Sequence, residues 1–151
     1  IKSIVLPENF KLYYRIYHPM LLLSSRQCLF RQVIGCEKNT MDGECIDACQ
    51  RSSSITNLNE VPLFIEKTKG NYPCVYHHHH FLNMEIVGDV PNVFSRFFID
   101  LRDIKTQTKI EMDKPGIIGL FENFLKGNSD SQEQLHQRIF PTTCAQYKKG
   151  I

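Results

Sequence analysis

Four cysteines that lie close together limit the fold of this chain more than any other feature of its sequence. Cys28, Cys36, Cys45 and Cys49 fall within 22 positions and are separated by seven, eight and three residues. The segment 27–54 around them is rich in polar residues and has no regular apolar pattern. We therefore expect something other than a hydrophobic core to order this segment.

The spacing of these cysteines favours a metal centre. Clustered thiols in a reducing compartment are more often metal ligands or catalytic groups than disulfides. Soft thiolates select zinc, copper(I) or iron–sulfur clusters. Structural zinc sites use ligand pairs with two to four residues between the members, and only Cys45 and Cys49 form such a pair. One short and two wide gaps suit a four-iron, four-sulfur cluster better, so we prefer that interpretation and keep zinc as the alternative.

Two further interpretations of the cysteines stay open. All four could be buried free thiols that pack as small apolar side chains, or they could form one or two disulfides in a secreted protein. Cys74 could replace one of the ligands, whereas Cys144 lies in a polar tail and is expected to be a lone thiol.

Composition and charge narrow the class of protein. An apolar content of 42% excludes a disordered chain, and the near balance of 18 basic and 16 acidic residues excludes a protein that coats polyanions. No apolar run is long enough to span a bilayer, so we expect a soluble, cytoplasmic protein without membrane contact. The chain starts at Ile1 in a strand-like run, which indicates a segment of a larger protein.

The apolar patterns predict a single α/β domain over 1–151, with a partial barrel-like mixed sheet, a β-hairpin, a cysteine-rich loop and two C-terminal helices. We expect strands in 1–27, the cysteine-rich segment in 28–54, the hairpin in 55–80, and an α/β and helical tail in 81–151. Runs at 1–6 and 11–23 read as strands, the second with a bend at His18-Pro19. Runs at 61–68 and 72–78 flank the turn residues 69–71 of the hairpin.

The second half of the chain carries helix signals. Residues 84–96 have helical spacing with Pro91 near the first turn, and 96–104 is a strand candidate. Asp113 can cap a helix over 114–126, which ends before Gly127. Its expected buried face consists of Ile117, Ile118, Leu120, Phe121, Phe124 and Leu125. A shorter helix is predicted from Ser129 to about Ile139, with Gln132 completing a capping box.

Several short elements resemble one known family. They occur in the same order as in that family: Arg26, Cys28 and Leu29; Gly43, Cys45 and Cys49; Leu82, Asn83, Glu85 and Ile86; Phe97, Ile99, Asp100 and Arg102; and the tail TTCAQYKKGI. Together they are similar to the collagenase-like peptidases of unknown catalytic type. The chain looks closest to the long members that act in ribosomal RNA hydroxylation.

The resemblance implies a barrel-like α/β domain whose cysteines Cys28, Cys36, Cys45 and Cys49 hold a four-iron, four-sulfur cluster. It also implies a role in the hydroxylation of RNA bases, completed by an upstream barrel domain of the same protein. A peptidase is the alternative that the family name suggests, although the sequence has no recognisable protease motif. A zinc-stabilised interaction module without catalysis is a further alternative. The isolated segment is expected to be inactive and could self-associate through the surface that its missing half would cover.

Candidate site residues lie at the ends of the predicted elements. Asp100, Arg102 and Asp103 follow an apolar strand, where α/β domains often place site residues, and otherwise they form a surface ion pair. Glu85, beside Asn83, is a weaker candidate. These residues are the catalytic candidates of the sequence.

Two basic or imidazole-rich groups could also bind a ligand. The four histidines 77–80 lie in a predicted strand end, where alternation allows at most two of them to reach one ion. An exposed strand end is the simpler interpretation. Arg26, Arg31, Lys38 and Arg51 are interleaved with the cysteines and could contact RNA phosphates, or could only balance thiolate charge.

Overall fold

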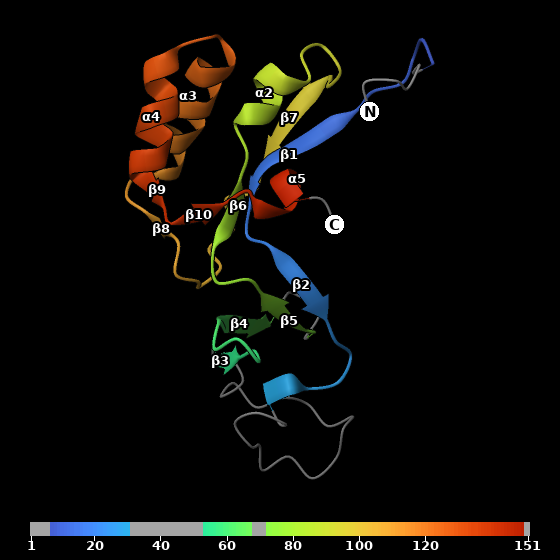
Figure 1. Ribbon diagram of the computed structural model, residues 1–151, viewed down its shortest axis with the longest axis vertical. Coiled ribbons are helices and arrows are strands. Elements are labelled where there is room, and N and C mark those ends of the chain that lie inside the picture. Colours follow the sequence, from blue (N-terminus) through green and yellow to red (C-terminus); the bar gives the residue numbers. More distant parts are fainter. Residues whose placement is uncertain (1–6, 31–52, 68–71, 150–151) are drawn as a thin grey trace. The chain divides into compact units, whose positions relative to one another are not determined.

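The computed structural model describes residues 7–30, 53–67 and 72–149, which form two compact units (Figure 1). Within these ranges, unit 1 draws on residues up to 18, 80–102 and from 109 onward, and unit 2 draws on 19–79 and 103–108. Both units contain a sheet, and every helix named below belongs to unit 1. The predicted mixed α/β class is confirmed. The described strands form no closed barrel, and the barrel-like arrangement stays a prediction.

Unit 2 is an antiparallel sheet. Its strands are β2 (Leu21–Ser24), β3 (Ser53–Thr56), β4 (Pro62–Lys67) and β5 (Pro73–Tyr76), in the order β2-β5-β4-β3. The predicted hairpin is confirmed as β4 and β5, although its turn at 69–71 lies outside the described residues. A small core of Phe30, Ile65 and Val75 holds the sheet.

Unit 1 is built on a mixed sheet with the order β10-β6-β1-β7. The strands are β1 (Tyr13–His18), β6 (His80–Leu82), β7 (Arg96–Ile99) and β10 (Thr142–Thr143). Strand β1 pairs antiparallel with β6 and parallel with β7. The expected break at His18-Pro19 is confirmed, because β1 ends at His18 and β2 belongs to unit 2. A second, two-stranded sheet pairs β8 (Lys109–Ile110) with β9 (Ile139–Phe140).

Helix α2 (Glu85–Asp89) is shorter than the sequence suggested. The predicted helix over 84–96 with Pro91 in its first turn is wrong, because the helix precedes the proline and ends there. Proline disfavours helical backbone in the residue before it, and Val90 accordingly leaves the helical region. The predicted strand over 96–104 is likewise limited to β7, because Asp100 begins a turn.

Helix α3 (Lys114–Leu125) begins as predicted and ends one residue earlier, with Lys126 as its C-cap. The Asp113 carboxylate accepts a hydrogen bond from the Gly116 amide, and Gly127 follows with a positive φ of 94°. Ile117 and Phe121 are buried, and Leu120 and Phe124 pack against the same core. Ile118 and Leu125 are not part of the buried face, since about two fifths of each is exposed. They lie seven positions apart on the flank of a stripe narrower than predicted.

Helix α4 (Ser129–Arg138) has a different cap from the one expected. Asn128, not Ser129, is the capping residue, and its side-chain oxygen accepts from the amides of Asp130 and Ser131. Asn128 has the extended backbone that a cap requires, whereas Ser129 is already the first helical residue. The last helix of the described part is α5 (Ala145–Lys149).

The core of unit 1 joins the sheet to α2, α3 and α4. Its buried members come from β1, β6, the start of α2, α3, α4 and β9: Ile16, Tyr17, Leu82, Met84, Ile86, Ile117, Phe121, Leu135 and Ile139. None of the helices in the described ranges combines the length and apolarity that crossing a bilayer requires.

Candidate functional site

Asp100 and Arg102 meet at the carboxyl end of β7, as the sequence suggested. The Arg102 amide and guanidinium both donate to the Asp100 carboxylate, with a shortest nitrogen-to-oxygen distance of 2.8 Å. The Asp100 amide in turn donates to the Tyr17 carbonyl at 2.8 Å, which extends the parallel ladder between β1 and β7. The carboxylate is thus placed where the carboxyl ends of two parallel strands meet. Asp103 is exposed.

Electrostatics keep Asp100 ionised. Partial burial alone would raise the pKa of its carboxyl, but the hydrogen bonds and charge of Arg102 lower it, and the charge of Arg15 adds to this effect. The net result is a pKa below the ordinary value. Because the donors come from Arg102, two positions away, the pair closes a local turn, and the Asp100 carboxylate is an ionised acceptor rather than a proton donor.

Tyr17 and His80 form a buried polar pair at the same edge of the sheet. The distance from Tyr17 Oη to His80 Nδ1 is 2.6 Å, and the ring centroids are 5.6 Å apart. Burial, followed by the charge of Asp100, raises the pKa of Tyr17, so the hydroxyl stays protonated. We had not predicted this pair. The available signal was that His80 begins the apolar run with Phe81 and Leu82, whereas 77–79 precede it.

The contacts that the structure gives Glu85 do not include Asp100, Arg102, Tyr17 or His80. Its carboxylate accepts from Lys148 Nζ at 3.0 Å, which ties α2 to α5. The hydroxyl of Tyr147 donates to Asp89 at 2.6 Å and makes a second tie, and this bond raises the pKa of Tyr147 to about 12. The neighbouring Asn83 is buried and structural, since its oxygen accepts from the Ile86 amide at the start of α2.

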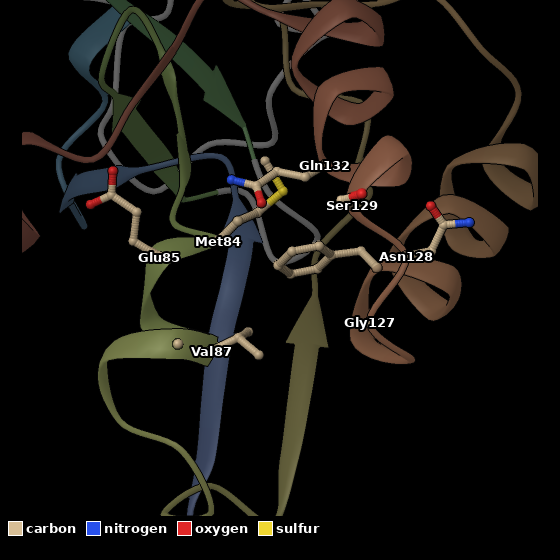
Figure 2. A pocket seen from close by; sticks show the side chains of 9 residues that line it. Met84, Glu85, Val87, Gly127, Asn128, Ser129 and Gln132 are labelled. Atoms are coloured by element: carbon tan, nitrogen blue, oxygen red, sulfur yellow. The ribbon is translucent and has the colours of Figure 1, made fainter.

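A pocket of about 370 Å³ lies in unit 1 between α2 and the junction of α3 with α4. Its apolar lining consists of Met84, Val87 and Phe124, and the polar side chains of Asn128, Ser129 and Gln132 complete it. Figure 2 shows the Glu85 carboxylate pointing away from the other lining side chains. The pocket therefore offers two side-chain amides, those of Asn128 and Gln132, and an apolar floor.

The cysteines fall into a described and an undescribed group. Cys28 is a free, half-buried thiol that packs against the core of unit 2. Cys74 is buried, and its sulfur lies 3.0 Å from Ser24 Oγ. Cys144 is free and half-buried just before α5. The ligand candidates Cys36, Cys45 and Cys49 lie outside the described residues, as do Arg31, Lys38 and Arg51. Over 7–30, 53–67 and 72–149 there is no group of three metal-ligating side chains.

The four histidines do not form the exposed strand end that we expected. His80 is buried in β6, and His77 to His79 form a half-buried connection before it. The rings of His77 and His78 are 4.1 Å apart and those of His78 and His79 are 4.0 Å apart. Burial first, and then the neighbouring imidazoles, lower the pKa of His78 and His79. The alternation expected of a strand fails because 77–79 form a turn, in which the His79 amide donates to His77 Nδ1.

Comparisons with protein-family models, curated proteins and solved structures found no match for this chain.

Proposed function

We propose that the chain is an iron–sulfur-bearing domain of a protein that hydroxylates RNA bases, with Cys28, Cys36, Cys45 and Cys49 as the cluster ligands. The observation that carries the proposal is the presence of four thiols within 22 positions. Four thiolates are the usual ligand set of a four-iron, four-sulfur cluster, so the donor chemistry fits. Such a cluster, when bound, supplies one-electron redox chemistry or structural support.

The surroundings of Cys28 support its place in this set. Its thiol is free and accessible on one side, and on the other side it packs against the cluster of Phe30, Ile65 and Val75. An apolar wall limits the access of water to an iron–sulfur cluster, which is one way a protein tunes its potential. Cys74 is less suitable, because its buried sulfur already interacts with Ser24.

The RNA part of the proposal rests on the resemblance to the long members of the collagenase-like family. Arg26 is exposed two positions before Cys28, so at least one basic side chain of the interleaved set is available to a phosphate. Asp100, held ionised by Arg102, is the acidic candidate residue of this proposal.

The cluster is tested by anaerobic purification, visible absorption, and analysis of iron, sulfide and zinc. Brown protein with about four irons per chain is expected for the wild type, and the colour should be lost in Cys45→Ala. Cys144→Ala is the matched control, since it removes a half-buried thiol of unit 1 and should leave the iron content unchanged. Colourless protein with about one zinc would favour an interaction module. Absence of any metal would overturn the proposed ligand set.

The reaction is tested separately in cells. A strain without the gene should lack one hydroxylated RNA base, and the wild-type gene, but not Cys45→Ala, should restore it. Mass spectrometry of digested RNA measures the outcome. Intact modification in the deletion strain would contradict the RNA role, and cleavage of denatured collagen by the purified full-length protein would instead favour the peptidase alternative.

A further inference from the structure

One face of the sheet in unit 1 presents aromatic and basic side chains to solvent. Tyr13 lies opposite Arg96, and Arg15 lies opposite Phe98, in the parallel pair of β1 and β7, which run side by side (Figure 1). All four side chains are exposed, and Tyr13 and Phe98 retain 54% and 55% of their accessible surface. Alternation along each strand places the four on one face.

The opposite face explains why these residues are not needed for folding. Tyr14 and Phe97, the intervening residues, pack against Phe94 with ring centroids 5.0 and 5.9 Å from it. They belong to the margin of the main core. A strand pair that already buries one aromatic from each strand has no packing reason to expose another from each, so the exposed rings call for a ligand.

The charge of this face is positive. Neither Arg15 nor Arg96 has an ion pair in the part of the chain that the structure describes. Arg15 instead lies over the Phe98 ring, with its guanidinium carbon 5.7 Å from the ring centroid. The charge of Arg15 acts on Asp100, and that carboxylate is already bound by Arg102. Upstream of β1, Lys11 is exposed and so is one acid, Glu8.

We propose that this face, made of Tyr13, Arg15, Arg96 and Phe98, binds single-stranded RNA. Strand spacing and rise place the two rings on a diagonal about 8 Å apart, so that each can stack on one base. The two arginines lie on the other diagonal, where they can bind the phosphates. Stacking rings interleaved with cations on an open sheet are suited to unpaired nucleotides, whose bases have free faces.

The choice of RNA over other single strands rests on the proposed role in RNA hydroxylation, whereas the face itself rests on the geometry of the two strands. A protein partner could bind through apolar contacts with the Tyr13 and Phe98 rings alone. Such a partner would also have to desolvate Arg15 and Arg96, which have no ion pair in the described part of the chain, and this desolvation costs free energy. Phosphates would instead pair with the two arginines, so a phosphate-bearing ligand is favoured.

The test measures binding of a short fluorescein-labelled oligouridylate to the 151-residue chain by fluorescence anisotropy. Tyr13→Ala and Phe98→Ala should each weaken binding by about fivefold to a hundredfold, the usual effect of removing one stacking ring. Tyr13→Phe keeps the ring and should bind as the wild type does. Arg15→Ala should reduce the slope of log affinity against log salt by about 0.7.

Arg138→Ala is the matched charge control, because Arg138 is exposed on α4 and lies outside the proposed face. It should leave affinity at physiological salt unchanged, and helical circular dichroism should be the same for all variants. Equal binding by Tyr13→Ala, Phe98→Ala and wild type would overturn the proposal and leave the face to a protein partner.

The outcome is separable from that of the proposed function. If the deletion strain is rescued by Tyr13→Ala and Phe98→Ala as well as by wild type, the RNA role stands and the binding face is wrong. If the deletion strain keeps the modified base while the anisotropy series behaves as expected, the face is supported and the hydroxylation role falls.

Discussion

Replacing Tyr17 with phenylalanine should destabilise unit 1 by about 1–3 kcal/mol. The substitution keeps the ring, and with it the packing of Tyr17 on Phe121, whose centroid is 6.1 Å away. Only the hydroxyl, 2.6 Å from His80 Nδ1, is lost. A made hydrogen bond contributes about 0.5–1.5 kcal/mol, and a buried polar atom deprived of its partner costs about 1–3 kcal/mol.

The larger figure applies because neither residue can recruit water. Tyr17 is fully buried and only 2% of His80 is exposed. Because the pKa of Tyr17 is raised, the hydroxyl stays neutral at the pH of an ordinary stability experiment. The loss should therefore be the same at neutral and mildly alkaline pH.

Urea unfolding followed by circular dichroism at the helical band is a suitable assay, since α2, α3, α4 and α5 belong to unit 1. Tyr13→Phe, which removes an exposed hydroxyl from the same strand, is the control and should change the unfolding free energy by less than about 0.5 kcal/mol. A double-mutant cycle with His80→Ala isolates the pair. Wild-type stability of Tyr17→Phe would refute the reasoning.

Three further outcomes follow from other contacts. Asn128→Ala removes the cap of α4 and should lower the unfolding free energy by about 1 kcal/mol in the same assay. His77→Ala should raise the pKa of His78 and His79 in an NMR titration, because the charge of His77 lowers both, and unchanged values would contradict this coupling. Asp100→Asn should cost up to about 1 kcal/mol at neutral pH. The folded pKa of Asp100 is below its ordinary 3.8, so this difference should be complete above that pH and should vanish as the pH falls through the folded value, as acid titration of wild type and variant would show.

Local elements of the fold were predictable because their signals lie within a few residues. Asp113 and Gly127 delimit α3 through contacts that span a single turn, and the hairpin of β4 and β5 follows from two apolar runs around a short turn. The exact ends of elements were less predictable. Pro91 stopped α2 rather than starting it, and the choice between Asn128 and Ser129 as a cap depended on one residue's backbone.

The candidate site was predictable only where its residues are neighbours in sequence. Asp100 and Arg102 are two positions apart, and their turn follows from that spacing. The pairing of Tyr17 with His80 joins positions 63 apart, and the apolar run that His80 begins indicates only its burial, not its partner. Strand order is hard to predict for the same reason, since residues 19–95 separate β1 from its partner β7 in the sequence.

The way unit 2 interrupts unit 1 has a consequence for the order of folding. Pairing of β2 with β5 brings Leu21 opposite Tyr76, a few residues from the place where His18 meets Phe81 in the pairing of β1 with β6. Once the pairing of β2 with β5 has formed, the effective loop between His18 and Phe81 is shortened from about sixty residues to roughly ten. The entropic cost of closing that loop then falls by about 2 kcal/mol. We therefore expect the sheet of unit 2 to form first. Its formation should favour the pairing of β1 with β6, the two central strands of unit 1, in the native register.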